Sequence, residues 1–225
     1  MRHLHHWNRL MGYPYENCEF LKSAQIMKQC PSDIGREVAF AGRSNAGKSS
    51  ALNTITKQKK LARTSKTPGR TQLMNYFSFG VDDRYLVDLP GYGFAKVAKK
   101  VKDEWNKHLA NYLEKRRSLV GLVILMDIRH PLKEHDMEMI QWGITSELPL
   151  RLVLTKSDKL KRGPAQSTLL KVRSQFKQYD FVSVQTFSSL NEDGVKELRA
   201  FLDQNLYIDE SEIIEGDVQD DSPEE

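Results

Sequence analysis

A short glycine-containing segment between an apolar run and a helical pattern constrains this chain more than any other feature. The run EVAFAG (37–42) has the apolar, β-branched character of a buried strand, and Gly42 to Ser49 then follow the pattern GxxxxGK[ST]. Two glycines let successive backbone N–H groups converge on an anion, and the following helix adds its positive N-terminal end. The segment therefore predicts a phosphate-binding loop. Its position disfavours the alternative, a glycine turn before an ordinary helix.

Two side chains of this loop have a specific chemical role in the prediction. Lys48 can reach terminal phosphates as a point charge, and Ser49 offers a hydroxyl oxygen to Mg²⁺. This hard ion prefers oxygen from phosphate, hydroxyl groups and water. The candidate phosphate-binding residues are Gly42, Arg43, Ser44, Asn45, Ala46, Gly47, Lys48 and Ser49.

Further apolar runs alternate with helical patterns along the chain. The runs lie at 73–79, 84–90, 119–129, 150–158 and 181–189. Apolar residues recur at helical spacing from Val97 to Leu113 and from Val195 to Leu202. Runs this apolar usually lie in a sheet that is covered on both faces. The alternation predicts a three-layer α/β/α P-loop NTPase domain with a mainly parallel central sheet, which binds ligands at the carboxyl ends of its strands.

The length of the chain suits one such domain. We expect an N-terminal extension at 1–35 with one added segment around Phe20–Met27, a globular domain at 36–207, and a disordered acidic tail at 208–225. No apolar run approaches the roughly 20 residues that cross a bilayer, and the N-terminus lacks the apolar core of a signal peptide. Two cysteines outside any CxxC pair fit a reducing compartment. We therefore expect a cytoplasmic monomer with no membrane insertion.

Charge is distributed unevenly along the sequence. Residues 209–225 carry nine of the 30 acidic side chains and no Lys or Arg, so the rest of the chain has a net charge of +13. So basic a body favours a polyanionic partner such as nucleic acid, although a merely solvated basic surface is the alternative. The densest basic run comprises Lys96, Lys99, Lys100, Lys102, Lys107, Lys115, Arg116 and Arg117.

A DxxG pattern follows the apolar strand predicted at 85–87. Its residues are Asp88, Leu89, Pro90 and Gly91. The Asp88 carboxylate would face the metal, commonly through a water molecule, and the Gly91 N–H could meet a γ-phosphate. DxxG alone more often marks a turn, but its place about forty residues after the phosphate loop favours a nucleotide site.

Two later segments predict a base-binding site. Thr155, Lys156, Ser157 and Asp158 end the run at 150–158, and Phe187, Ser188 and Ser189 end the run at 181–189. An ionised Asp158 matches the N1–H and exocyclic N–H donors of guanine, a pair that adenine lacks. Lys156 can lie along the ring, Thr155 can brace the loops, and backbone N–H groups at 187–189 would approach guanine O6. The pattern predicts GTP in preference to ATP, the alternative nucleotide.

Other polar residues follow the apolar run at 119–129. Asp127, Arg129, His130, His135 and Asp136 form a cluster that could act in acid–base chemistry. We expect these residues to cap helices and anchor loops instead.

The motifs in this order resemble those of the EngB family of bacterial GTPases. The matching segments are GRSNAGKSS (42–50), TSKTPGRTQLMNYF (64–77), DLPGYGFAKV (88–97), LTKSD (154–158) and FSSL (187–190), within about residues 20–206. The resemblance implies that Thr71 contacts Mg²⁺ and the γ-phosphate. It also implies that the nucleotide is lined by Gly69, Arg70, Thr71, Gln72 and Leu73. It further implies assembly of the large ribosomal subunit, with that particle's precursor as partner, and a link to cell division and septation.

Two positions bear on hydrolysis. Tyr92 stands directly after the DxxG glycine, where many GTPases have a Gln that orients the attacking water. We therefore expect slow intrinsic hydrolysis with acceleration by a partner or a cation. Asn45 suggests K⁺ as that cation, since an Asn at this position helps to bind K⁺ in related GTPases; the alternative is that Asn45 only shapes the loop.

The sequence thus predicts a Mg²⁺-dependent GTP-binding switch with slow GTPase activity. Lys48, Thr71, Gly91 and Asn45 are its candidate catalytic residues, and Ser49 and Thr71 are its candidate metal ligands. The alternative function is a nucleotide-bound assembly factor that binds ribosomal RNA or proteins and does not require hydrolysis.

Overall fold

A computed structural model describes residues 13–62, 73–80, 83–92 and 99–207, and for 99–106 the backbone alone. Seven strands form one sheet in the order β1-β3-β4-β2-β5-β6-β7. The strands are β1 (Glu19–Ala24), β2 (Arg36–Gly42), β3 (Met74–Ser78), β4 (Arg84–Asp88), β5 (Leu119–Asp127), β6 (Leu150–Thr155) and β7 (Val182–Thr186). The pairs from β4 through β2, β5 and β6 to β7 are parallel, whereas β3 is antiparallel to both β1 and β4. The predicted mainly parallel sheet is confirmed.

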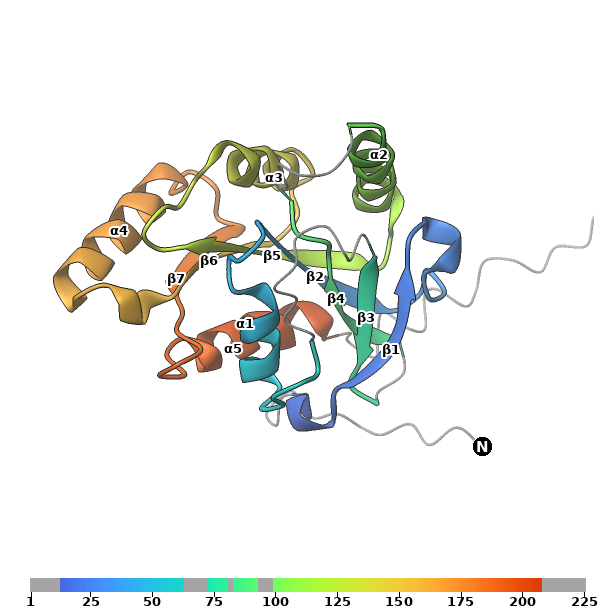
Figure 1. The fold of residues 1–225 in the computed structure, drawn as a ribbon, viewed down its shortest axis with the longest axis horizontal. Coiled ribbons are helices and arrows are strands. Elements are labelled where there is room, and N and C mark those ends of the chain that lie inside the picture. Colours follow the sequence, from blue (N-terminus) through green and yellow to red (C-terminus); the bar gives the residue numbers. More distant parts are fainter. Residues whose placement is uncertain (1–12, 63–72, 81–82, 93–98, 208–225) are drawn as a thin grey trace, which may run out of the picture.

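Helices cover both faces of this sheet. They are α1 (Lys48–Ile55), α2 (Lys99–Lys115), α3 (Glu134–Thr145), α4 (Arg162–Gln175) and α5 (Val195–Leu206), with short 3₁₀ turns η1 (Tyr15–Asn17), η2 (Met27–Gln29) and η3 (Ser157–Lys159). Figure 1 shows α1 and α5 on one side of the sheet and α2 and α3 on the other. The predicted three-layer α/β/α architecture is therefore confirmed.

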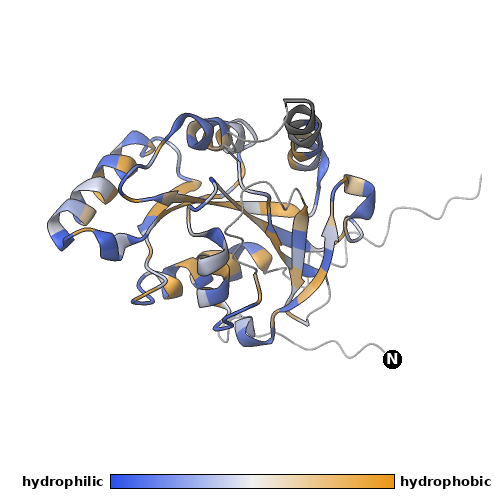
Figure 2. Cartoon of the chain, in the orientation of Figure 1, coloured by the Kyte–Doolittle hydropathy of each residue, from blue (hydrophilic) through white to orange (hydrophobic). Residues whose placement is uncertain are grey.

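Alternation along the central strands explains why the sheet needs both layers. On β2, Val38 and Phe40 join the core beneath α1 and α5, whereas Ala39 and Ala41 join the core beneath α2, α3 and α4. All four side chains are fully or almost fully buried. The strands are correspondingly hydrophobic in Figure 2, while blue, hydrophilic positions recur along the helices. A strand that is apolar on both faces is stable only between two covering layers.

The segment at 13–35 is part of the same fold. β1 extends the sheet by pairing with β3, and Tyr15 is buried with its hydroxyl donating to Asp203 on α5 at 2.7 Å. The sequence placed these residues in an extension with one added segment, because their short polar run lacks the apolar character of the central strands. β1 is an edge strand whose first four residues are exposed, which explains that composition.

One member of the predicted basic run is buried in the protein and does not lie on its surface. Arg116 is buried and makes an ion pair with Glu37, so its assignment to a basic surface was wrong. Its neighbour Arg117 is 88% exposed at the side chain. The side chains of Lys96, Lys99, Lys100 and Lys102 and the acidic segment at 208–225 lie outside the described residues. Among the described helices, none combines the length and the apolar character needed to span a membrane.

Candidate functional site

The loop between β2 and α1 has the backbone geometry that a phosphate-binding segment requires. Gly47 adopts φ +94° directly before α1, and Asn45 adopts φ +65°, a left-handed conformation that Asn tolerates better than most residues. At Gly42, a Cβ atom would lie 2.8 Å from the Leu125 carbonyl oxygen on β5. Both glycines of the motif are therefore demanded by the fold, one by its φ angle and one by close packing.

The end of β4 brings the DxxG segment beside this loop. Leu89 donates its N–H to the Phe40 carbonyl at 3.0 Å, which continues the parallel pairing of β2 and β4. Lys48 makes an ion pair with Asp88, and only about a tenth of each side chain is exposed. A hydroxyl from Ser49 and a carboxylate from Asp88 are the kind of hard oxygen donors that Mg²⁺ accepts. The Lys48–Asp88 pair thus joins the start of α1 to the end of β4.

Thr155 connects the phosphate loop to two strands. Its hydroxyl is buried, within 2.6 Å of the Ala46 carbonyl oxygen and 3.1 Å of the Met126 carbonyl oxygen, at the end of β6. Gly47 faces the same side chain, because a Cβ added there would lie 3.6 Å from it. The sequence predicted that Thr155 braces the loops, and this contact shows how it can do so.

Lys156, the next residue, also contacts the phosphate loop. Its ammonium group donates to the Asn45 carbonyl at 2.8 Å and makes a 3.0 Å ion pair with Asp127. Arg129 and Lys156 together hold the pKa of Asp127 well below its usual range. Lys156 itself adopts φ +58°, which turns the chain after β6 into η3. The Lys156 side chain thereby connects the end of β6 to the phosphate loop and to the end of β5.

Asp158 is oriented by Ser188. The Ser188 hydroxyl accepts N–H groups from Leu190 and Asn191 at 3.2 Å and donates to the Asp158 carboxylate at 2.7 Å. This bond, followed by the nearby Lys159 ammonium, holds the pKa of Asp158 below its usual range. The aspartate is therefore an anionic acceptor at neutral pH, as pairing with guanine donors requires.

Comparisons with known proteins agree with this geometry. Residues 37–156 match the family model of 50S ribosome-binding GTPases. The chain is 56% identical over 190 residues to the probable GTP-binding protein EngB of Vibrio parahaemolyticus, covering 84% of this chain and 86% of that protein. It is likewise 56% identical over 192 residues to the same-named protein of Pseudoalteromonas translucida, covering 84% of this chain and 86% of that one.

The chain belongs to the EngB family of GTP-binding proteins.

Solved structures agree on the fold. A crystal structure of a probable GTP-binding protein EngB matches with a TM-score of 0.60 at 22% identity, covering 76% of this chain and 98% of that one. Era of Aquifex aeolicus bound to GDP.AlF₄⁻ matches with a TM-score of 0.60 at 18% identity, covering 77% of this chain and 57% of that one. At these identities the likeness shows the fold alone.

Not every site residue predicted for this EngB family member is placed as expected. The N–H groups of Phe187 and Ser188 donate to the carbonyls of Leu154 and Asp193, so they are not free to meet a base. Leu89 buries its side chain in the core. Leu73 directly precedes β3, whereas Gly69, Arg70, Thr71 and Gln72 lie outside the described residues.

Two acidic residues gain a place at the EngB site that the sequence did not assign. Asp127 anchors Lys156, and Asp136 accepts both the Lys133 N–H at 3.0 Å and the Tyr92 hydroxyl at 2.9 Å. The expectation that this cluster caps helices and anchors loops is confirmed for Asp127 and Asp136. Their partners were not foreseeable, because each lies on a different element. A carboxylate at the carboxyl end of a central strand, as at Asp127, is the signal that could have suggested a link to the site.

Proposed function

We propose that the protein binds GTP with Mg²⁺ at the carboxyl edge of its sheet and hydrolyses it slowly, as a cytoplasmic monomer. The observation that carries this proposal is the Ser188–Asp158 bond on one side of Lys156, whose ammonium group binds the phosphate loop on the other. A guanine held by Asp158 would therefore lie at a defined distance from phosphates held at 42–49. Family membership supports the same nucleotide.

Each group has a distinct part in this function. Lys48 neutralises the terminal phosphates, and Ser49 and Thr71 would hold Mg²⁺, with Asp88 facing it through water. Bound Mg²⁺ supplies positive charge to the β- and γ-phosphate oxygens. The Gly91 N–H has no hydrogen-bond partner among the described residues, which leaves it available to a γ-phosphate oxygen.

Slow hydrolysis follows from the position of Tyr92. Its hydroxyl is buried against Asp136, so it does not orient a water molecule at the phosphate. A partner or a cation would therefore supply the missing assistance. Asn45 offers K⁺ as a candidate, whereas its φ of +65° and its carbonyl bond to Lys156 favour the loop-shaping role. Comparing hydrolysis in K⁺ and Na⁺, with Asn45→Asp as control, decides between them: equal rates in the wild type exclude K⁺.

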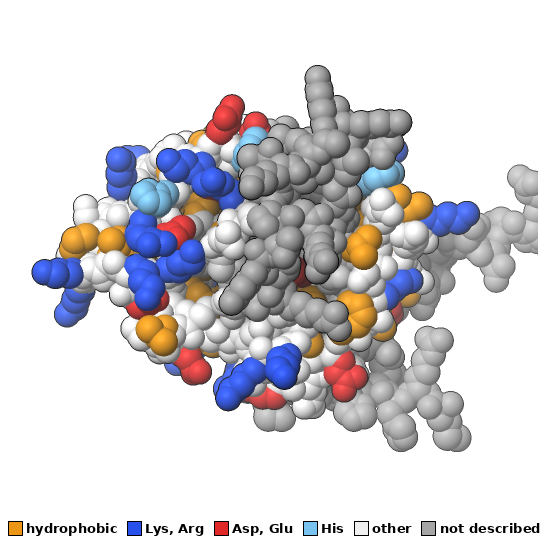
Figure 3. Space-filling model, in the orientation of Figure 1, with side chains coloured by type: hydrophobic (Ala, Val, Ile, Leu, Met, Phe, Trp, Pro, Cys, Tyr) orange, Lys and Arg blue, Asp and Glu red, His pale blue; other side chains and the backbone are white. Residues whose placement is uncertain are grey.

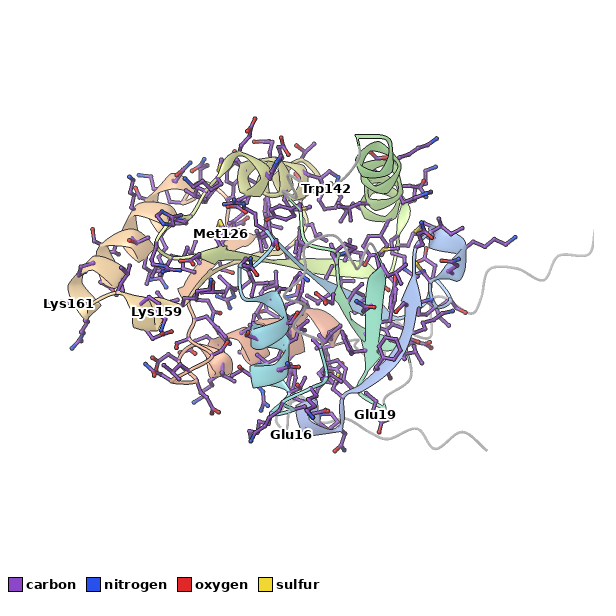
Figure 4. All side chains as sticks on the ribbon, in the orientation of Figure 1. Glu16, Glu19, Met126, Trp142, Lys159 and Lys161 are labelled. Carbon is purple, nitrogen blue, oxygen red and sulfur yellow. The ribbon has the colours of Figure 1, made fainter. Side chains whose placement is uncertain are left out.

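The partner we propose is the precursor of the large ribosomal subunit, with a consequent role in cell division. The family model of ribosome-binding GTPases and the basic body of the chain support this partner. Blue side chains gather in Figure 3 at the end of the molecule that α4 occupies, where Figure 4 labels Lys159 and Lys161. Both lysines are exposed, so phosphate groups of RNA can reach them.

The sharpest test of the nucleotide is a change of base specificity. Asp158→Asn presents one acceptor and one donor, which match xanthine N1–H and its 2-carbonyl instead of the two donors of guanine. We expect GTP affinity to fall by at least about a hundredfold and XTP affinity to rise. The control is Asp180→Asn, an exposed residue before β7 with the same change of charge. Unchanged GTP affinity in Asp158→Asn, or equal competition by ATP in the wild type, excludes the proposal.

A second candidate function is an assembly factor in which GTP is a passive ligand. The engagement of Tyr92 with Asp136 favours it, because no described side chain is then left at that position to assist hydrolysis. The two functions differ in how the nucleotide controls the partner. Equal binding of ribosomal particles in the GDP and GTP states would favour the passive factor, and isolation of the particles bound in each state measures it.

A further inference from the structure

The Tyr92 side chain connects the DxxG segment to the opposite helix layer. It is 7% exposed, and its hydroxyl donates to the Asp136 carboxylate at 2.9 Å in a fully buried hydrogen bond. Its ring meets that of His135 edge-on, with the centroids 6.5 Å apart. Burial, followed by the Asp136 charge, raises the pKa of the Tyr92 hydroxyl well above its usual range, so this group keeps its proton and acts as a hydrogen-bond donor at any physiological pH.

Asp136 is itself held in place by the start of α3. Its second carboxylate oxygen accepts the Lys133 N–H at 3.0 Å, which satisfies a backbone donor at the helix N-terminus. The side chain is 1% exposed. One carboxylate thus joins the N-terminus of α3 to Tyr92, and its bond to the Tyr92 hydroxyl is buried.

The backbone of Tyr92 is bonded to the phosphate loop on its other side. Its N–H donates to the Gly42 carbonyl and its carbonyl accepts the Ser44 N–H, both at 3.3 Å, in a parallel bridge with Arg43. Gly91 lies between Asp88 and this bridge. The position of its N–H, which has no partner among the described residues, therefore depends on where Tyr92 is held.

We infer that Asp136 is a positioning residue for recognition of the γ-phosphate, acting through the Tyr92 hydroxyl to hold the Gly91 N–H against the phosphate loop. This inference rests on the proposed function, because it assumes that GTP binds at 42–49. GDP has no γ-phosphate, so the connection from Asp136 through Tyr92 matters for GTP and not for GDP. Breaking the connection should therefore change the ratio of GTP affinity to GDP affinity.

Tyr92→Phe tests the inference directly, since it keeps the ring and removes the hydroxyl. We expect affinity for a non-hydrolysable GTP analogue to fall about tenfold, while GDP affinity stays within about twofold, because a single charge-assisted hydrogen bond has this scale. Asp136→Ala should give the same loss, and the double variant should be no worse than either single variant, because both remove one connection. Isothermal titration with each nucleotide measures all of these affinities.

The chain offers a matched control for loss of stability alone. Tyr112 is also buried and donates its hydroxyl to a buried carboxylate, Glu37 at 2.6 Å, but at the opposite edge of the sheet. Tyr112→Phe should lower the melting temperature as much as Tyr92→Phe does and leave the ratio of GTP to GDP affinity unchanged. The inference is overturned if Tyr92→Phe weakens both nucleotides equally, or if Tyr112→Phe shifts the ratio as much. Wild-type protein that binds neither nucleotide would instead refute the proposed function.

Discussion

The amino ends and the carboxyl ends of the parallel strands form two opposite edges of the sheet, and each edge carries a network of charged side chains. The two networks differ in how many hydrogen-bonding groups they leave without a partner. At the amino edge, Glu37 at the start of β2 is fully buried and accepts hydrogen bonds from Tyr112 and twice from Arg116, at 2.6 to 3.1 Å. Arg116 also donates to the carbonyls of Pro31 and Ser32. This network fastens the end of α2 to β2 and to the segment before it.

At the carboxyl edge, two carboxylates keep hydrogen-bonding positions that the described protein groups do not fill. Asp88 is bonded by Lys48 through one carboxylate oxygen, and within the described part of the chain its other oxygen has no partner. Asp158 is bonded by Ser188 and by Lys159, whose side chain is 55% exposed and free to turn away. About a tenth of each aspartate side chain remains exposed, so a ligand can bind the carboxylate oxygens that the protein leaves open.

The difference separates stabilisation from binding. A buried charge that is fully paired is compatible with the fold, whereas removing one partner leaves the other charge buried without compensation and destabilises the folded state. A charge that is oriented by one neighbour and remains partly exposed can bind a ligand, and replacing it should change stability less. Variants at the amino edge should therefore change the free energy of unfolding, and variants at the carboxyl edge should change affinity.

The largest expected effect is at the amino edge. Arg116→Ala leaves the Glu37 carboxylate buried without its cation, which should lower the free energy of unfolding by about 3–5 kcal/mol. Urea denaturation measures this loss, and Arg117→Ala is the control because that neighbour is exposed and should change stability by less than about 0.5 kcal/mol. Equal losses in the two variants would contradict the assignment of Arg116 to the core.

The next effect is at the carboxyl edge and concerns affinity. Lys48→Ala should weaken binding of GTP about a hundredfold, or about 2.7 kcal/mol, because charged hydrogen bonds to the phosphates are lost. Its loss of stability should be smaller than that of Arg116→Ala, since both members of the Lys48–Asp88 pair reach solvent. Lys57→Ala, which breaks an exposed pair with Glu16, is the control and should leave affinity unchanged. A Lys48 variant that unfolds as readily as Arg116→Ala would erase the distinction between the edges.

The smallest effect tests how Asp158 is oriented. Ser188→Ala should lower the free energy of unfolding by about 1–1.5 kcal/mol at neutral pH, because Asp158 loses its hydroxyl donor. Since the pKa of Asp158 is lowered in the folded state, the stabilising bond is fully present above the unfolded pKa of about 3.9 and is lost as pH falls through the folded value. The difference between wild type and variant should stay constant from pH 8 to 5 and shrink below pH 4. A difference that grows on acidification would exclude this role.

Sequence patterns predicted the central part of the fold better than its edge. The five parallel strands come from short, mostly apolar runs followed by turn residues, which is a local signal. β1 has mostly exposed residues, so only its pairing with β3 makes it a strand of this sheet. Arg116 was assigned to a basic surface for a similar reason: its neighbours in sequence are basic, but it directly follows α2 and its side chain pairs with the buried Glu37.

The sequence by itself determined the order of strand, phosphate loop and helix, the DxxG segment and the acidic residue that we propose binds the base. These are local patterns whose chemistry requires particular residues at short spacing. Only the tertiary structure decided that Lys156 meets Asn45, that Tyr92 meets Asp136 and that Arg116 meets Glu37, pairs that are between 44 and 111 positions apart. Each depends on which strands are neighbours and on the direction of one side chain, and neither property is encoded in local spacing.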